Sequence, residues 1–418
     1  MKVYLFYIAL FLQLLVEMLP ILPNFVTYVA LFFFIVYLMS DGGIHISKEY
    51  FRWMVIVFGF FSLSVIWAID WKIAAWKLVY GLFPVLVVSI ATYNFLVRTT
   101  NGIRKVLWIY LVAAGILLMY VLLNIGDIRA MAEGERIGGL VSENAGVDDT
   151  EAHFNSNMIG MNLCYALFAG YILFFRKNKN YLIRLVVLVV AALVVYLVLM
   201  TGSRKSIILL VLPFIVLPFL SKNNGKKMLL IPIAASIVAV GFYLIMYVPI
   251  LYEVMGSRVE EMINIISGTT TGGEDISRVM LIQYGFEWFL QKPLFGYGIN
   301  NFRVLSDNTV LFAGRNFYSH NNYIELLVGV GVIGFLIYYS CYFYFWKRLR
   351  KHVSGDLLNS WAVVLIIISL FLDIAMVSYY SGIRNLILCI CFYAAARTSQ
   401  RVKINYKNNE TNRYYPSM

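Results

Sequence analysis

The sequence predicts an all-α polytopic membrane protein with about twelve transmembrane helices, and two observations support this prediction. Hydrophobic residues make up 61% of the 418 residues and charged residues only 13%, which is about half the usual charged share of a soluble protein. The apolar residues also form continuous runs, and a run of about 20 is what a spanning helix requires. Because only helices and closed barrels satisfy backbone polar groups in lipid, continuous rather than alternating runs favour helices.

The apolar runs divide the chain into four parts. We expect nine transmembrane helices in residues 1–247, a large extracytoplasmic loop at 248–319, three further helices in 320–396 and a polar cytoplasmic tail at 397–418. The individual runs lie at 3–19, 25–40, 51–68, 74–96, 104–124, 155–175, 181–200, 206–220, 228–247, 321–346, 357–378 and 384–396.

The distribution of the formal net charge of +12 along the chain indicates how these helices are oriented in the membrane. Alternate connections and the tail carry most of the Lys and Arg residues, and cytoplasmic loops are the ones enriched in these residues. Both termini are therefore expected in the cytoplasm, which agrees with an even number of helices, since that number places both ends on the same side. The charge is explained by insertion and gives no support for nucleic-acid binding.

Two outer connections are longer than a simple turn. The first, 125–154, is acidic, and the second spans roughly 70 residues, a length that is usually functional. In the second, Asp275 to Ser277 can cap a helix that continues to Gln291. An amphipathic stretch at 252–266 precedes it, with a joint at 269–273.

Arg204 and Lys205 lie in a tight outer turn between two apolar runs. They can be snorkelling cations at the membrane interface. The positive-inside rule, however, disfavours two cations in so short an outer turn. A bound anion would compensate for them.

Arg278 and His320 are the other candidates on the outer side. Arg278 lies near the start of the expected loop helix, where the macrodipole attracts an anion, although an ion pair with Glu274 or Asp275 would explain it equally well. His320 leads into the tenth helix; alone it would be an interfacial side chain. Glycines at 329, 331 and 334 would permit close packing that holds it in place.

Charges within the apolar runs are costly in lipid. They are Glu17, Lys77, Glu325 and Asp373. Arg384, an outer cation between the last two runs, can pair with Asp373.

Three stretches together resemble the O-antigen ligase and polymerase superfamily. They cover about residues 196–346, less than half of the chain. They are Thr201 to Arg204; Arg278 followed by Trp288 and by Pro293 to Phe302; and His320 to Tyr323 followed by Leu327, Gly331 and Gly334.

This resemblance implies a bacterial cytoplasmic (inner) membrane protein of the lipid-dependent GT-C glycosyltransferase type, with an extracytoplasmic active site and no metal or cofactor. It implies that Arg204 and Arg278 bind the departing diphosphate, as guanidinium groups do well. It also implies that His320 takes the proton of the acceptor hydroxyl. We further expect substrate-binding roles for Asn321, Tyr323, Arg384 and Lys205.

Three activities remain open. We favour a polymerase that joins polyprenyl-diphosphate-linked oligosaccharide repeat units by inverting transfer, for O-antigen, capsule or exopolysaccharide. A ligase that passes glycan to a lipid core or a protein is the alternative. A lipid-linked oligosaccharide flippase is the second alternative, although no two-fold repeat supports a transporter. The partners of a polymerase would be a glycan donor and acceptor, a chain-length regulator and a flippase.

Overall fold

The computed structural model describes residues 2–124 except 20 and 41, 155–175, 180–220, 224–264 except 258 and 261–263, 274–309, 316–350 and 356–414. These residues contain helices and turns and no strand, which confirms the predicted all-α class. The acidic connection at 125–154, the joint at 269–273 and part of the amphipathic stretch at 252–266 lie outside the described residues.

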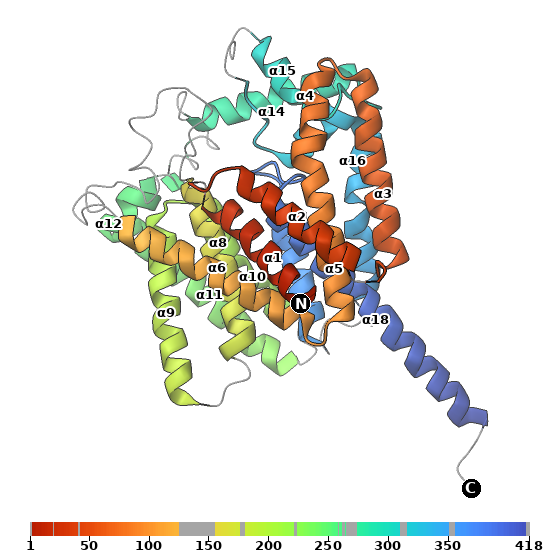
Figure 1. Ribbon diagram of the computed structural model, residues 1–418. Helices are drawn as coiled ribbons and strands as arrows, with labels where there is room; N and C mark the ends of the chain where they lie inside the picture. The colour runs from red at the N-terminus through yellow and green to blue at the C-terminus, as the bar shows by residue number, and fades with distance from the viewer. Residues whose placement is uncertain are drawn as a thin grey trace. The chain divides into compact units, whose positions relative to one another are not determined.

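Each apolar run lies on a helix (Figure 1). The first half of the chain contains α1 (Lys2–Met18), α2 (Phe25–Ser40), α3 (Lys48–Leu63), η1 (Ser64–Trp67), α4 (Trp71–Trp76), η2 (Lys77–Leu82), α5 (Phe83–Arg98), α6 (Gly102–Asn124), α8 (Ser156–Gly170), η3 (Tyr171–Phe175) and α9 (Tyr181–Met200). The second half contains α10 (Arg204–Phe219), α11 (Asn224–Tyr247), α12 (Pro249–Leu251), η4 (Tyr252–Gly256), α14 (Glu274–Gln291), α15 (Phe302–Asp307), α16 (Asn322–Leu349), α17 (Leu357–Leu372) and α18 (Gly382–Tyr414).

Within the described residues, seven helices are long and apolar enough to cross a membrane. They are Lys48–Trp67, Trp71–Arg98, Gly102–Leu123, Ser156–Phe174, Tyr181–Met200, Met228–Tyr247 and Asn322–Leu349. Phe25–Ser40 and Leu357–Leu372 are shorter apolar helices. The chain is therefore a multi-pass membrane protein; the full set of twelve crossings and the cytoplasmic termini stay predictions.

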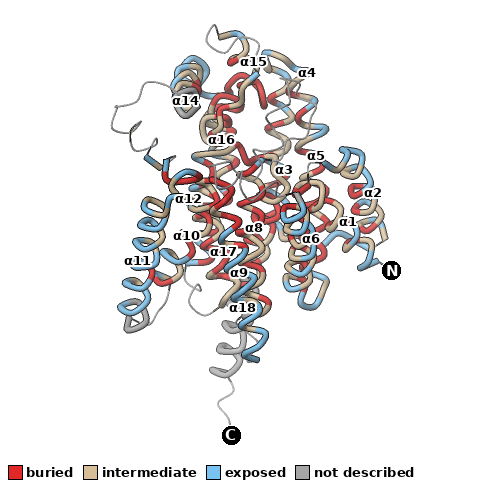
Figure 2. The backbone as a smooth tube through the Cα atoms, turned by 90° about the vertical axis from the view of Figure 1, so that its left-hand side faces the viewer, coloured by how far each residue is buried: buried red, intermediate tan, exposed pale blue. Residues whose placement is uncertain are grey.

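Two of these helices, α9 and α11, expose surfaces that are almost entirely apolar. On α9 and α11 most side chains are exposed, although nearly all of them are apolar; Figure 2 shows this for α11, which is largely pale blue. A helix that is hydrophobic around its whole circumference and yet exposed is typical of one that faces lipid.

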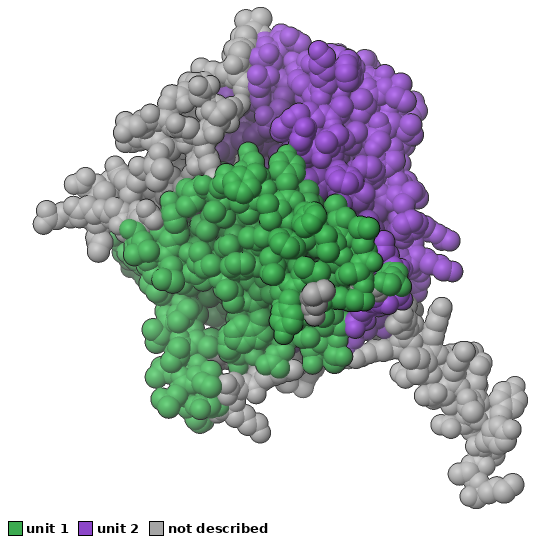
Figure 3. Space-filling view, in the orientation of Figure 1, with its two compact units in different colours: residues 1–43, 99–276 green, residues 44–98, 277–418 purple. Residues whose placement is uncertain are grey.

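The chain divides into two compact units, coloured separately in Figure 3. Unit 1 consists of residues 1–43 and 99–276, and unit 2 of residues 44–98 and 277–418. Each unit thus takes segments from distant parts of the sequence.

Unit 1 is held by close contacts between its helices. The α1–α2 hairpin packs Phe6 against Phe34, with ring centroids 5.9 Å apart. Tyr110 on α6 donates a hydrogen bond to the side chain of Asn162 on α8 at 3.1 Å. Because Tyr110 and Asn162 are both buried, this bond satisfies polar groups that would otherwise be costly in the unit's interior.

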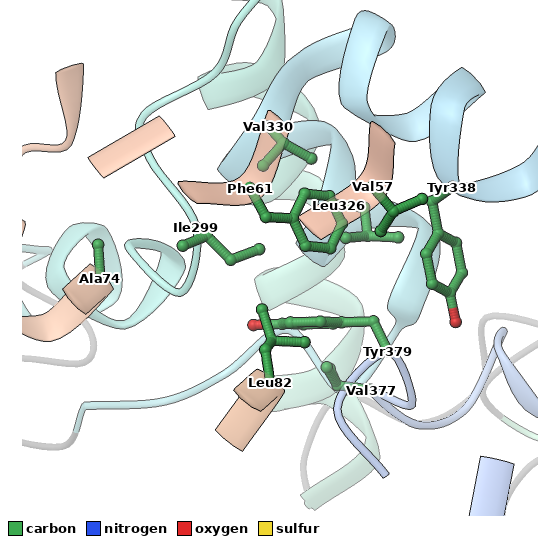
Figure 4. Packing of buried hydrophobic residues seen from close by; sticks show 10 residues of the cluster. All are labelled: Val57, Phe61, Ala74, Leu82, Ile299, Leu326, Val330, Tyr338, Val377 and Tyr379. Carbon is green, nitrogen blue, oxygen red and sulfur yellow. The ribbon is translucent and has the colours of Figure 1, made fainter. Parts of the chain in front are cut away.

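Unit 2 has its core between α3, α16 and the segment that precedes α18. Phe61 of α3 stacks on Tyr338 of α16 and meets Tyr379 edge to face, with centroids 6.4 and 6.0 Å apart. Figure 4 shows these rings together with Ile299 from the loop before α15. This core ties the loop to the membrane helices and so fixes the candidate site described next.

Candidate functional site

The loop from Pro293 to Asn301 docks into a break in α16. At Gly331 the backbone leaves the helical conformation, with φ 65° and ψ −174°. The amide of Tyr297 donates to the carbonyl of Val328 at 2.8 Å, and the amide of Val332 donates to the carbonyl of Pro293 at 2.8 Å. The loop therefore satisfies backbone groups that the break releases, as a broken membrane helix requires.

Two glycines make this docking possible. A Cβ on Gly296 would lie 2.4 Å from the Val328 carbonyl oxygen, and one on Gly331 would lie 2.2 Å from the Leu294 carbonyl oxygen. Both residues also have positive φ, 68° and 65°, which glycine adopts without steric cost. Of the three glycines expected to aid helix contact, Gly331 thus allows two backbones to approach each other.

Arg278 lies on α14, which packs against the same loop. Leu281 is buried with Tyr297, Phe302 and Val328 in one cluster. Trp288 meets Phe302 edge to face with centroids 5.2 Å apart, so it serves packing. This cluster holds α14 at its middle and fixes the turn that carries Arg278.

The side chain of Arg278 is partly buried. Helix α14 ends at Gln291, as the sequence predicted, but it begins at Glu274, before the expected cap at 275–277. The alternative ion pairs with Glu274 or Asp275 lie outside the described side chains.

His320 occupies a strained position just before α16. Its φ is 53°, in the left-handed region that non-glycine residues rarely adopt. Its ring packs on Tyr318 with centroids 4.0 Å apart. The hydroxyl of Ser306 donates to the carbonyl of Phe317 at 2.8 Å and so ties the segment to α15. These contacts, rather than packing at the three glycines, are the ones that surround His320.

Two cationic side chains, Arg303 and Lys77, lie in the surroundings of His320. The sequence offered no reason to associate either of them with it. The guanidinium carbon of Arg303 lies 5.3 Å from the ring centroid of Tyr318. Lys77, buried on η2, places its ammonium 3.0 Å from the ring centroid of Tyr380. Both cations interact electrostatically with the carboxylate of Glu325. In the sequence, Lys77 stands out as a charge within an apolar run. Arg303 has only a weak signal, which is that it directly follows the stretch Pro293 to Phe302 on which the resemblance rests.

Tyr380 remains a neutral phenol in these surroundings. Burial raises the pKa of Tyr380 to about 12. His320 and the five side chains described with it form what we call the His320 cluster. Its members are Lys77, Arg303, Tyr318, His320, Glu325 and Tyr380.

Three of the expected substrate-binding residues have partners within the fold. Asn321 caps α16, its side chain accepting from the amides of Tyr323 and Ile324 at 2.9 and 3.1 Å. The hydroxyl of Tyr323 donates to the carbonyl of Leu370 at 2.8 Å. These bonds give Asn321 and Tyr323 roles in stability, whatever they contribute to binding.

Arg384 is buried and pairs with Asp373, the alternative that the sequence left open. It also donates to the carbonyl of Ser369 at 2.8 Å. Asp373 accepts further hydrogen bonds from Tyr339 at 2.9 Å and from Ser378 at 2.5 Å. The pair joins α16, α17 and the start of α18.

Arg204 and Lys205 belong to unit 1 and open α10. Ser203 caps this helix, accepting from the amide of Ser206 at 3.3 Å, and donates to the side chain of Asn157 at 2.8 Å. Cations at a helix N-terminus are disfavoured by the macrodipole, whereas an anion is favoured there. The placement is consistent with the expected anion-binding role.

The described part of the chain contains no group of three or more His, Cys, Asp or Glu side chains placed to hold a metal ion.

One family model matches the chain. It is described as O-antigen ligase and covers residues 188–339, from α9 to the middle of α16, including Arg204, Arg278 and His320. No curated protein matches the chain. The match confirms the resemblance to the O-antigen ligase and polymerase superfamily.

Proposed function

Because residues 188–339 match the O-antigen ligase family, we propose that the chain is a polymerase of polyprenyl-diphosphate-linked oligosaccharide repeat units. It would act at the extracytoplasmic face of the membrane. The observation that carries this proposal is the fixed, strained position of His320 inside the matched region, since strain of this kind clusters at functional sites.

In the proposed reaction an acceptor hydroxyl oxygen attacks the anomeric carbon of the donor sugar. The bond from this carbon to the diphosphate oxygen breaks, and the diphosphate leaves with the electron pair. His320 takes the hydroxyl proton. The new glycosidic bond has inverted configuration because the attack comes from the face opposite the leaving group.

Arg278 would bind the departing diphosphate. Its guanidinium presents a planar set of donors that matches phosphate oxygens, and such a fork stabilises charge that develops as the bond breaks. Arg204, at the start of α10, is the second arginine that the resemblance implies, and we assign it the same kind of anion-binding role.

The description of the matching family favours a ligase as the second candidate. Purified protein supplied with lipid-linked repeat units tests both. A ladder of lengthened products supports the polymerase. A single transfer that occurs only when lipid core or protein is added identifies a ligase. Donor that stays chemically unchanged but crosses the bilayer would contradict both and favour a flippase.

A further inference from the structure

Glu325 is a buried acid that the proposed chemistry does not use. It lies in the first turn of α16 and is only 2% exposed. A carboxylate inside a membrane helix is costly and is retained where it has a specific partner. Its place near a helix N-terminus is favourable for a negative charge.

The partner of Glu325 is the backbone beside His320. Its Oε2 accepts a hydrogen bond from the amide of Ser319 at 2.9 Å. The hydroxyl of Ser319 in turn donates to the carbonyl of Asn321 at 2.7 Å and accepts from its amide at 3.2 Å. The residues on both sides of His320 are thus joined to each other, and Glu325 holds the pair.

Two cations compensate the negative charge of Glu325, while its hydrogen bond with the Ser319 amide stays in place. Arg303 and Lys77 both interact with the carboxylate. Arg303 also lies over the ring of Tyr318, 5.3 Å from its centroid, and that ring packs on His320. Glu325 therefore supports His320 in two ways: through the Ser319 backbone, and through Arg303 and Tyr318, which pack toward the His320 ring.

We propose that Glu325 is a positioning residue that keeps His320 in its left-handed conformation by binding the amide of Ser319. A non-glycine residue keeps such a conformation only where its surroundings impose it. Without the bond, the segment before α16 would relax and the imidazole would turn away from its position. The inference rests on the proposed role of His320 as the base.

Two variants separate the hydrogen bond from the charge. Glu325→Gln retains an oxygen that can accept from the Ser319 amide, whereas Glu325→Leu removes it. In the purified transfer assay we expect the kcat of Glu325→Gln to stay within a few-fold of the wild-type value. We expect Leu to lose about 100-fold in kcat with KM little changed, as a misplaced catalytic group does.

A third variant weakens the same link while the Glu325 side chain stays in place; it also removes a hydrogen bond from the Ser319 hydroxyl to that carboxylate. Ser319→Ala removes the hydroxyl that joins Ser319 to Asn321, and we expect a smaller loss in kcat at constant KM. This variant decides the question if Glu325→Leu fails to insert.

The control is Asn359→Leu. Asn359 is 4% exposed and accepts a hydrogen bond from Thr398 at 3.1 Å, so its replacement removes buried polar bonding in unit 2 at residues outside the segment 316–321. Its kcat should equal that of wild type. Hydrogen exchange in 316–321 should rise in Glu325→Leu and stay unchanged in the control.

The outcomes also separate this inference from the proposed function. If His320→Ala abolishes transfer and Glu325→Leu does not, only the inference about Glu325 is wrong. The inference is also wrong if Glu325→Gln lowers kcat as much as Glu325→Leu does. If His320→Ala transfers normally, the proposed role of His320 as the base is wrong and the inference fails with it; wild-type protein that gives no lengthened product would instead contradict the proposed polymerase function. A double variant of His320→Ala and Glu325→Leu should lose no more activity than His320→Ala, since residues that act as a unit are not additive.

Discussion

At the residue scale, the arginines of unit 2 have different surroundings. Arg384 is 4% exposed and is engaged with Asp373 and a backbone carbonyl. Arg278 is partly buried at the start of α14. Burial with a carboxylate indicates a role in stability, whereas the position near a helix N-terminus suits an anion. The two residues should therefore fail in different ways when they are replaced.

Replacing Arg384 by Met should destabilise the protein. The change leaves the carboxylate of Asp373 buried without its cation, which costs about 3–5 kcal/mol. We expect low abundance and a lower Tm in detergent, and partial recovery in the double variant Asp373→Leu/Arg384→Met. A stable Arg384→Met protein that no longer transfers glycan would instead support the substrate-binding role expected from the sequence.

Replacing Arg278 by Ala should reduce transfer about 100-fold or more at normal abundance, because a donor aimed at developing charge is lost. Arg278→Lys keeps the charge without the planar fork and should recover only part of the rate. The matched control is Arg397→Ala, which breaks a 3.5 Å ion pair with Asp356 at the surface; such pairs contribute little. Equal activity in the Ala, Lys and wild-type proteins would remove Arg278 from the mechanism.

At the scale of elements, the break in α16 joins the loop to the membrane. Residues 293–297 supply hydrogen-bond partners for residues 328–333, and the loop's Ile299 enters the core with Phe61 and Tyr338 (Figure 4). The first turn of α16 carries Glu325, and His320 lies immediately before it. The position of His320 therefore depends on the docking of a loop that ends 19 residues earlier in the chain.

Gly331→Ala should disrupt this docking. The new Cβ would lie 2.2 Å from a carbonyl oxygen, at a residue whose φ is positive. We expect loss of abundance, or loss of transfer in the protein that remains, measured in membranes. The control is Gly59→Ala on α3, where nothing lies within 4 Å of the added Cβ; a helical Gly to Ala change there should be neutral or stabilising by up to about 1 kcal/mol. Similar behaviour of the two variants would contradict the close backbone approach.

At the scale of the whole molecule, the predicted all-α, multi-pass class is confirmed, and the predicted orientation can be tested. Asn308 after α15 and Lys347 at the end of α16 are both exposed. In a background without the four buried cysteines, we expect a membrane-impermeant thiol reagent to label Asn308→Cys and not Lys347→Cys in intact cells. After lysis both should react. The reverse pattern would show that the positive-inside assignment is inverted.

The helices could be predicted from the sequence because each apolar run is a local signal. The arrangement around His320 could not, because it depends on contacts between distant residues. No local pattern indicates that Gly296 meets the carbonyl of Val328, or that Arg303 lies over Tyr318. The pairing of Arg384 with Asp373 was one of two alternatives, and burial decided it.

The central claim is that His320 is the base of a glycan polymerase. The most direct measurement uses purified wild-type and His320→Ala proteins, matched in amount and Tm, with lipid-linked repeat units in a defined bilayer. We expect a ladder of lengthened lipid-linked products from wild type and only unextended donor from the variant. A ladder of the same length and rate from both proteins would contradict the account.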